Sequence, residues 1–435
     1  MITEPVTGLI GVVALLALLL SGMPIGIALG LVGLAGLTLT IGLEPALIKS
    51  GVLLFETLTR YELGTLPLFM LMAHLCFVAG ASRDFFDMAS RFFGHRRGGL
   101  AIASVAGCAG FGSINGSSLA TTATMGLVAV PEMRSREYSD MLATGSVAAG
   151  GTLGQMIPPS GALIVFGIIA EQSIGALFTA AIVPGLTQML SYFLVIALWV
   201  AWRPGIAPRM PRASWAQRRA AIRRVSDIGA LVVAVTGGIV AGWVTPSEAA
   251  ALGASGAFVI CIVRGRFSRS ALRRALEDTL RTSGLIYLVI IGALIFAAFI
   301  SVTGLTDAIG AAIAGMGLGP VGTMLLVAVF LLLIGSVLDG LALMLLTTPI
   351  LLPLVADLGL SAVWFGIFLV RAMEIGFVHP PIGMNLYVIQ GVAPDISLGR
   401  IFKGVLPFLV ADLIHLVLLV VFPILVLGLP QWLGR

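Results

Sequence analysis

Long apolar runs that do not alternate with polar residues constrain the fold of this chain most strongly. Two examples are ALVVAVTGGIVAGWV at 230–244 and TMLLVAVFLLLIGSVL at 323–338. Helices and closed barrels are the structures that satisfy backbone polar groups inside a lipid bilayer, and barrel strands alternate apolar and polar residues over about ten positions. The composition also fits a membrane protein, because 59% of the residues are hydrophobic and 10% are charged, whereas soluble domains are about 25% charged. We therefore predict an all-α polytopic membrane protein.

Several apolar stretches are each long enough for one or two membrane crossings of about twenty residues. We expect roughly ten to twelve crossings, with re-entrant segments in addition. The 54 Gly and 21 Pro residues indicate that many of these helices are broken or closely packed. The stretches lie near 5–43, 46–80, 99–130, 141–170, 174–202, 228–263, 283–317, 320–356, 361–392 and 401–430.

Charged residues and cysteines exclude several other classes of protein. The net charge of +5 is too small to indicate a nucleic-acid partner. Cys76, Cys108 and Cys261 lie in apolar stretches without paired spacing, so we expect buried side chains rather than a disulfide or a metal site. The polar interval 203–227 carries seven Arg and is predicted to be cytoplasmic. It is either a solvated linker or, over ASWAQRRAAIRR, an amphipathic helix on the membrane surface.

The sequence repeats itself with a constant offset between its two halves. GQMIPPSG at 154–161 matches GFVHPPIG at 376–383, and two further prolines align with the same offset. We read a first repeat at 1–202, a linker at 203–227 and a second repeat at 228–435. If each repeat crosses the membrane an odd number of times, the second is inverted and both termini are extracytoplasmic. The aligned pairs are Pro24 with Pro246, Pro131 with Pro353, Pro158 with Pro380, Pro159 with Pro381, Gly154 with Gly376 and Gly161 with Gly383.

The two Pro-Pro pairs, Pro158–Pro159 and Pro380–Pro381, are predicted to break membrane helices. Proline lacks an N–H and clashes with the carbonyl one turn earlier, and it also disfavours helix at the preceding residue. The freed carbonyls suit a desolvated Na⁺, and the helix that begins after each pair presents N–H groups to an anion. The alternative is a pair of kinks satisfied by Ser, Thr and water. Their duplication favours binding sites, because inverted repeats are typical of secondary transporters.

The stretch FGSINGSSLATTATMG at 111–126 is predicted to form a tight re-entrant tip. Ser113, Asn115, Ser117 and Ser118 supply neutral oxygens, which suit Na⁺ rather than Zn²⁺. The alternative is a helix-packing face of small residues. The corresponding segment at 334–349 carries Asp339, an intramembrane carboxylate that either binds a cation or carries a proton.

Other ionisable residues in apolar runs are expected to have structural roles. Arg371 and Glu374 are three positions apart, which predicts an ion pair on one helix face. Asp412 and His415 also share a face and are candidates for a pair. His379 is either a pH-sensitive lining residue or a satisfied interior histidine.

Two rival functions are consistent with single features of the sequence. GASG at 253–256 has the form of a serine-protease motif around Ser255, but such a match is common in a glycine-rich chain. A channel would leave two closed cation sites unexplained. Because Walker A, H-E-x-x-H and dinucleotide motifs are absent from the sequence, we expect neither an enzyme, nor an ATP-driven pump, nor a bound cofactor.

Four segments resemble the large membrane subunit of tripartite ATP-independent periplasmic (TRAP) transporters. They are GGTLGQMIPPS (150–160), HPPIGMNLYV (379–388), WVTPSEAAALG (243–253) and the tip at 112–118. The resemblance implies the fold of the ion-transporter superfamily: two inverted-topology repeats with broken helices and re-entrant hairpins, arranged as a scaffold and a mobile transport domain that works as an elevator. It also implies Na⁺-driven import of a small organic acid, such as a dicarboxylate or a sugar acid.

The same resemblance implies partners and a location. We expect a multi-pass protein of the bacterial inner membrane that works with a small four-helix membrane subunit and a periplasmic substrate-binding protein. Because nothing like the small subunit precedes Pro24, we expect that subunit to be a separate chain. The alternative is a stand-alone Na⁺- or H⁺-coupled carboxylate symporter or antiporter of the same fold.

Site residues also follow from the resemblance. His379 stands where a small hydroxylated residue is expected, which leaves proton coupling open. Na⁺ is the one coupling ion expected and no other metal is. The first cation site is assigned to Ser113, Asn115, Gly116, Ser117 and the carbonyls near Gly154, the second to Gly335, Ser336, Asp339 and the carbonyls near Gly376, and the substrate site to Ser118, Pro159, Pro381 and Asn385.

Overall fold

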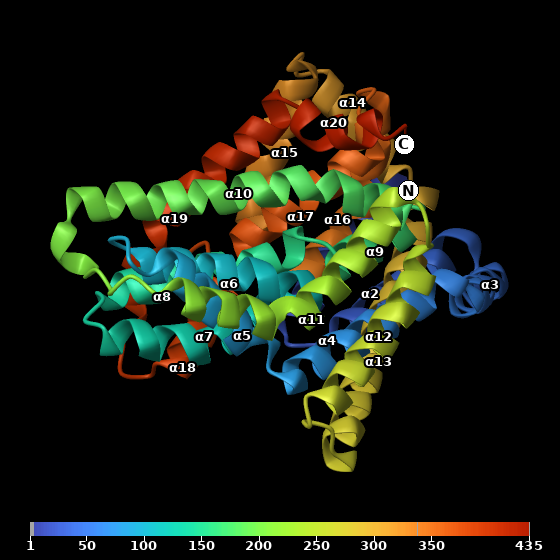
Figure 1. Ribbon diagram of the computed structural model, residues 1–435. Coiled ribbons are helices and arrows are strands. Elements are labelled where there is room, and N and C mark those ends of the chain that lie inside the picture. The colour runs from blue at the N-terminus through green and yellow to red at the C-terminus, as the bar shows by residue number, and fades with distance from the viewer. Residues whose placement is uncertain (1–3, 337, 435) are drawn as a thin grey trace.

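A computed structural model describes residues 4–336 and 338–434, and these residues form an all-helical protein (Figure 1). In the described ranges, seven helices are long and apolar enough to cross a membrane, or eight if one bent pair is a single span. The protein is thus a multi-pass membrane protein. The number is below the ten to twelve crossings expected, because several apolar helices, such as α6 (Gly99–Asn115) and α15 (Gly319–Gly335), have only 17 residues each.

The first repeat contains ten α-helices and one short 3₁₀ helix within the described residues. They are α1 (Glu4–Leu20), α2 (Ile25–Ile41), α3 (Leu43–Thr59), η1 (Tyr61–Gly64), α4 (Thr65–Ala79), α5 (Ala81–Phe93), α6 (Gly99–Asn115), α7 (Ser118–Ser135), α8 (Asp140–Met156), α9 (Gly161–Ile169) and α10 (Ile174–Trp202). A second 3₁₀ helix, η2 (Pro204–Ile206), follows α10.

The second repeat follows the first almost helix by helix. Its helices are α11 (Trp215–Ala241), α12 (Pro246–Val263), α13 (Arg269–Val302), α14 (Leu305–Ala314), α15 (Gly319–Gly335), α16 (Gly340–Asp357), α17 (Ala362–Gly376), α18 (Met384–Val392), α19 (Leu398–Val421) and α20 (Ile424–Trp432). At the offset found in the sequence, α7 corresponds to α16, α8 to α17, α9 to α18 and α10 to α19, while α13 covers both α3 and α4.

Helices of the two repeats pack against each other in reciprocal pairs. α2 packs on α13, and α12, the counterpart of α2, packs on α4. In the same way α8 contacts α19 while α17 contacts α10, and α18 contacts α7 while α9 contacts α16. Contacts that recur after the partners are exchanged are those expected around a pseudo-two-fold axis.

Glycines allow two of these pairs to approach backbone to backbone. A Cβ at Gly33 of α2 would lie 2.6 Å from the Phe296 nitrogen of α13. A side chain at Gly145 of α8 would overlap the carbonyl of Gly404 in α19, and one at Gly404 would overlap the carbonyl of Met141. Small residues at such crossings permit the close helix contacts that stabilise membrane bundles.

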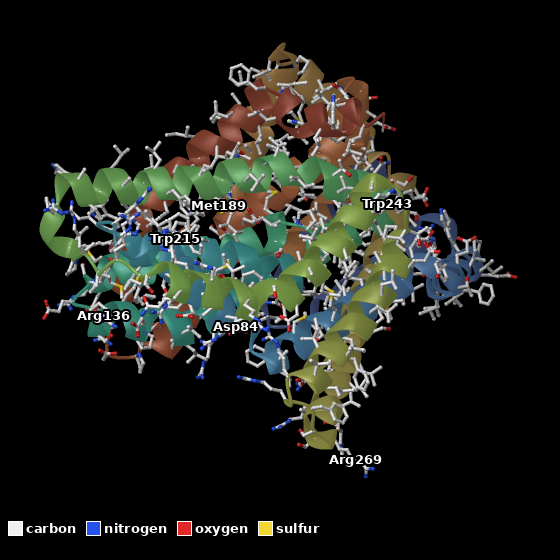
Figure 2. All side chains as sticks on the ribbon, viewed as in Figure 1. Asp84, Arg136, Met189, Trp215, Trp243 and Arg269 are labelled. Carbon is white, nitrogen blue, oxygen red and sulfur yellow. The ribbon has the colours of Figure 1, made fainter. Side chains whose placement is uncertain are left out.

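Only the first part of the basic interval 203–227 is a linker between helices. α11 begins at Trp215, where Ser214 and Gln217 form a capping box, so 215–227 is the first part of a membrane-length helix. Of the two alternatives for ASWAQRRAAIRR, a helix is therefore observed, and it continues without a break to Ala241. Figure 2 places Trp215 and Trp243 on opposite sides of the view. Both chain ends lie on the side away from the α10–α11 connection (Figure 1).

Candidate substrate and cation site

The first hairpin has its tip at Gly116 and Ser117. α6 ends at Asn115, Gly116 adopts a left-handed conformation with φ of 64°, and Ser117 caps α7 by accepting a hydrogen bond from the Ala120 nitrogen at 3.4 Å. The tip contacts the start of α9, because the Gly161 nitrogen donates to the Gly116 carbonyl at 3.2 Å. The predicted re-entrant tip is thus present, and it lies against the predicted break.

The helix break at residues 157–160 is also present. α8 ends at Met156 and α9 begins at Gly161, with a bend of 40° between them. Pro158 and Pro159 are both buried. A Cβ at Gly154 would lie 2.5 Å from Thr121 Oγ1 and 2.9 Å from the Ser117 carbonyl oxygen. The structure therefore brings together Gly154 and Ser117, two of the residues assigned to the first cation site.

Two other residues of that assignment have partners of their own. Ser113 Oγ donates to the Gly110 carbonyl at 2.8 Å, and Asn115 Nδ2 donates to Thr121 Oγ1 at 3.4 Å. Ser113 is buried and Asn115 is half-buried. Both residues lie in the last turn of α6, on the hairpin that faces Gly154.

Three polar residues beside this tip were not among the predicted ligands: Thr121, Thr122 and Gln155. In the described part of the chain, the buried atoms Thr122 Oγ1 and Gln155 Oε1 have no hydrogen-bond partner. Thr122 packs so closely on Gly151 of α8 that a side chain there would overlap its hydroxyl. A buried oxygen without a hydrogen-bond donor is costly. Thr122 Oγ1 and Gln155 Oε1 therefore suit the coordination of a cation that binds neutral oxygens. The signal was the ATTAT run at 120–124, directly after the tip.

The second hairpin places its acidic residue at a helix start. Asp339 caps α16, with Oδ2 accepting from the Leu341 nitrogen at 3.1 Å. Ser336 Oγ donates to the Leu333 carbonyl at 2.7 Å. A Cβ at Gly376 would lie 2.7 Å from the Gly335 carbonyl oxygen. Gly335 and Gly376 thus meet, as Ser117 and Gly154 do in the first repeat.

The second break is more open to the surface than the first. α17 ends at Gly376 and α18 begins at Met384, and Pro380 is half-buried while Pro381 is exposed. His379 is half-buried, and its Nδ1 has no hydrogen-bond partner among the described residues. Of the two alternatives for His379, the satisfied interior histidine is therefore not observed.

Two residues assigned to the substrate site, Ser118 and Asn385, touch each other. Asn385 Nδ2 donates to Ser118 Oγ at 2.9 Å and to the Ala148 carbonyl at 3.0 Å. Both side chains are fully buried. The bonds join the first hairpin, α8 and the start of α18, so the hairpin of one repeat and the broken helix of the other meet at this point.

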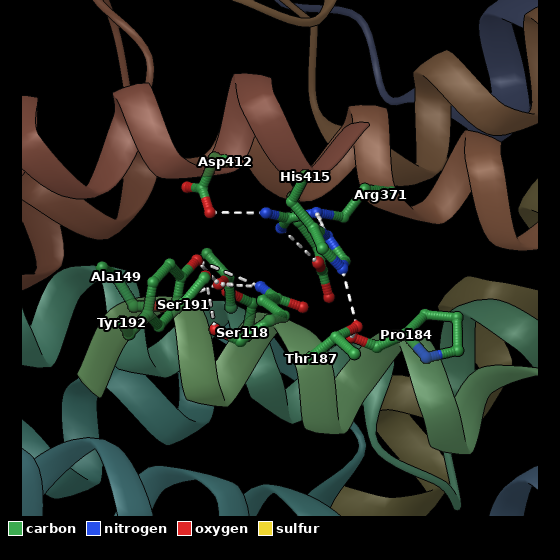
Figure 3. A network of polar contacts seen from close by, with 12 residues as sticks. Ser118, Ala149, Pro184, Thr187, Ser191, Tyr192, Arg371, Asp412 and His415 are labelled. Atoms are coloured by element: carbon green, nitrogen blue, oxygen red, sulfur yellow. Dashed lines mark hydrogen bonds and ion pairs between the residues drawn. The ribbon is translucent and has the colours of Figure 1, made fainter. Parts of the chain in front are cut away.

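A buried charge network lies between α17, α19 and α10 (Figure 3). Arg371 donates to Glu374 Oε2 at 3.1 Å, which confirms the predicted pair, and to Asp412 Oδ1 at 2.5 Å. Its Nε donates to His415 Nδ1 at 3.1 Å, so Nε2 of that ring carries the proton and donates to Thr187 Oγ1 at 2.9 Å. Asp412 and His415 share a face, as expected, but each binds Arg371.

The serine-protease alternative has no geometric support. Ser255 lies exposed within α12. His415 uses both ring nitrogens for Arg371 and Thr187. The described residues contain no group of three His, Cys, Asp or Glu side chains that could hold a metal ion.

A multi-pass helical protein in which two hairpins dock against two broken helices has the architecture of a membrane transporter. The family model described as "Tripartite ATP-independent periplasmic transporter, DctM component" matches residues 12–425. The chain belongs to this family of TRAP transporter large permease proteins, a class of membrane transporters and not of enzymes.

Relatives of this chain are named for different substrates. The C4-dicarboxylate TRAP transporter large permease protein DctM of Pseudomonas aeruginosa is 34% identical, over 92% of this chain and 94% of that protein. The sialic acid TRAP transporter large permease protein SiaM of Vibrio cholerae is 31% identical, over 96% of each chain. The crystal structure of the YdaH transporter of Alcanivorax borkumensis has a similar fold, with a TM-score of 0.58, 17% sequence identity and coverage of 90% of this chain and 89% of that one.

Proposed function

We propose that this protein is the membrane-embedded transport subunit of a secondary active importer of the bacterial inner membrane. It carries a small organic anion, a carboxylate such as a dicarboxylate or a sugar acid, together with Na⁺. A periplasmic binding protein delivers the substrate, and a small four-helix membrane subunit completes the assembly. The family description supports this division of labour, because it names a tripartite, ATP-independent and periplasmic system.

The observation that carries the proposal is the contact between Ser118 and Asn385 (2.9 Å). It joins a hairpin tip to a helix that begins after a Pro-Pro break, so a helix N-terminus and hydroxyl and amide groups converge where the repeats meet. Helix N-termini favour anions, and substrate sites of such transporters lie at the interface of the repeats.

Coupling to Na⁺ is supported by the chemistry of the oxygens around Gly154. The Ser117 carbonyl and Thr121 Oγ1 lie beside Gly154, the unpartnered Thr122 Oγ1 lies beside Gly151 one turn earlier in α8, and all three oxygens are neutral. Neutral oxygens suit a hard monovalent cation that must be released again on the other side of the membrane. Residues Ser117, Thr121 and Thr122 would hold the ion, and Asp339 would contribute a carboxylate in the second repeat.

An elevator motion is the mechanism that we propose for this architecture. Helices α2, α4, α12 and α13 pack reciprocally and form the scaffold. The hairpins α6–α7 and α15–α16, with the broken helices and with α10 and α19, form the moving transport domain. The α10–α11 connection then lies in the cytoplasm and both termini are extracytoplasmic.

The test is uptake into proteoliposomes that contain this chain and the small membrane subunit. We expect accumulation only when the binding protein, loaded with its own ligand, and an inward Na⁺ gradient are both present. Asn385→Ala should abolish uptake, whereas Tyr387→Phe, on an exposed side chain of the same helix, should not. Uptake of free substrate without the binding protein would instead favour the stand-alone symporter, and uptake driven by a proton gradient would refute Na⁺ coupling.

A further inference from the structure

A groove runs along the outer surface between α10 and α19. Its walls are apolar, formed by Leu194, Leu198 and Trp199 of α10 and by Val410, Ile414 and Leu418 of α19, and its volume is about 750 Å³. Several of these side chains are strongly exposed, including Leu198 (61%) and Ile414 (57%). We call this surface the α10–α19 groove. Its floor reaches Thr187 and His415, at the edge of the buried charge network (Figure 3).

One end of the α10–α19 groove opens into a second, polar cavity of about 690 Å³. The two share Trp199, Trp202 and Pro407, so they form one continuous surface. The polar cavity is lined by Arg203, at the end of α10, and by Arg400 and Lys403, in the first turns of α19. We call these three side chains the basic cluster.

The basic cluster has an excess of positive charge. Asp140 is its one carboxylate among the lining residues, and it is shared between Arg134 at 3.2 Å and Arg400 at 3.7 Å. Arg203 stacks on the Trp202 ring at 4.7 Å. Lys403 forms no ion pair within the part of the chain that the structure describes. All three cations are exposed. Arg400 is paired with Asp140, so Arg203 and Lys403 are available to an anion from outside.

We propose that this continuous surface binds one anionic phospholipid, with an acyl chain in the α10–α19 groove and the phosphate at the basic cluster. From Thr187 to Trp202, α10 rises about 22 Å, which exceeds the hydrocarbon depth of one leaflet, about 15 Å. Tryptophans occupy the membrane interface, and Trp199 and Trp202 lie between the apolar and the basic parts. The inference rests on the proposed function, in which this end of α10 faces the cytoplasm, and basic pockets between membrane helices on that side bind anionic headgroups. Guanidinium groups match phosphate oxygens in geometry as well as in charge.

Charge complementarity selects an anionic lipid over a zwitterionic one. A choline or ethanolamine headgroup would bring its own cation to a site with three cations and one shared carboxylate. A glycerol headgroup leaves the phosphate charge uncompensated, so it fits the excess. This lipid would also cover His415 and Thr187, the point at which the charge network comes nearest to the groove.

Thermal unfolding in mixed micelles tests the proposal, with phosphatidylglycerol and phosphatidylcholine of the same acyl chains as probes. We expect phosphatidylglycerol to raise Tm of the intact protein by at least ~3 °C more than phosphatidylcholine does. A triple variant, Arg203→Gln with Arg400→Gln and Lys403→Gln, should lose this difference. A control with the same change of charge, Arg209→Gln with Arg219→Gln and Arg223→Gln, should keep it.

Native mass spectrometry supplies a second measurement. The intact protein and the control should each retain one phosphatidylglycerol, and the triple variant should retain none. If the triple variant does not fold, Lys403→Gln is compared with Arg209→Gln by the same two measurements, and only the first should weaken binding. The proposal is wrong if the intact protein shows no preference between the lipids, if the basic-cluster variants keep it, or if the control loses it equally.

Discussion

Asn385 donates a hydrogen bond to Ser118 at 2.9 Å, although the two residues are 267 positions apart in the chain. The second N–H of the same amide binds the Ala148 carbonyl at 3.0 Å. The fully buried side chain of Asn385, in α18 of the second repeat, thus binds both the hairpin (Ser118) and the broken helix α8 (Ala148) of the first repeat.

Replacing Asn385 by alanine should abolish uptake and weaken the fold moderately. The change leaves Ser118 Oγ without its buried partner, at a cost of roughly 1–3 kcal/mol, and removes a second hydrogen bond from the Ala148 carbonyl, which lies within helix α8. Thermal unfolding and uptake are measured on the same preparation. Tyr387→Phe is the control, and equal uptake by Asn385→Ala and the intact protein would remove Asn385 from the substrate site.

Arg371→Met should destabilise the protein strongly. The side chain is fully buried and binds Glu374, Asp412 and His415, so its removal leaves two buried carboxylates unpaired, at a cost of roughly 3–5 kcal/mol. Unfolding in detergent should show a large fall in Tm. Arg273→Met is the matched control, since its pair with Glu277 is exposed and should contribute little.

A double-variant measurement distinguishes the charge of this network from its shape. Arg371→Met combined with Asp412→Asn removes a cation and an anion together, so it should recover part of the lost stability. No recovery would mean that packing of the arginine stem, rather than pairing of its charge, stabilises this region.

The features that depend on local chemistry could be predicted from the sequence. Two prolines in succession break a helix wherever they lie, so the ends of α8 and α17 followed from Pro158 and Pro380. Gly116 and Ser117 likewise predicted the hairpin tip, because one takes a left-handed conformation and the other caps a helix.

Contacts that depend on how helices pack could not be predicted. The spacing of Arg371 and Glu374 gave their pair, but nothing local indicates that Asp412 and His415 of α19 would face the same guanidinium. Thr122 could not be predicted as a ligand, because its hydroxyl is buried without a partner only when α7 packs on Gly151 of α8.

Gly404→Ala should prevent α8 and α19 from packing. The added methyl group would overlap the Met141 carbonyl. Because backbone cannot move aside as a side chain can, the strain should cost ~1–3 kcal/mol or more. Size-exclusion chromatography and thermal unfolding measure the loss of folded protein. Gly399→Ala, near the start of the same helix and in open space, should be harmless. Normal folding of Gly404→Ala would show that the two helices can separate.

Asp339 offers a variant that separates helix capping from ion binding. Asparagine keeps the size of the side chain and the oxygen that accepts from the Leu341 nitrogen, so Asp339→Asn should fold with nearly unchanged Tm. Loss of the negative charge should nevertheless raise the Na⁺ concentration needed for half-maximal uptake at least ~10-fold, because a carboxylate attracts a cation far more strongly than an amide does in a site of low dielectric. Asp339→Ala removes the cap as well and should lower Tm in addition. If Asp339→Asn retains the Na⁺ dependence of the intact protein while Asp339→Ala is merely less stable, Asp339 is a capping residue and the cation of the second repeat is bound without it.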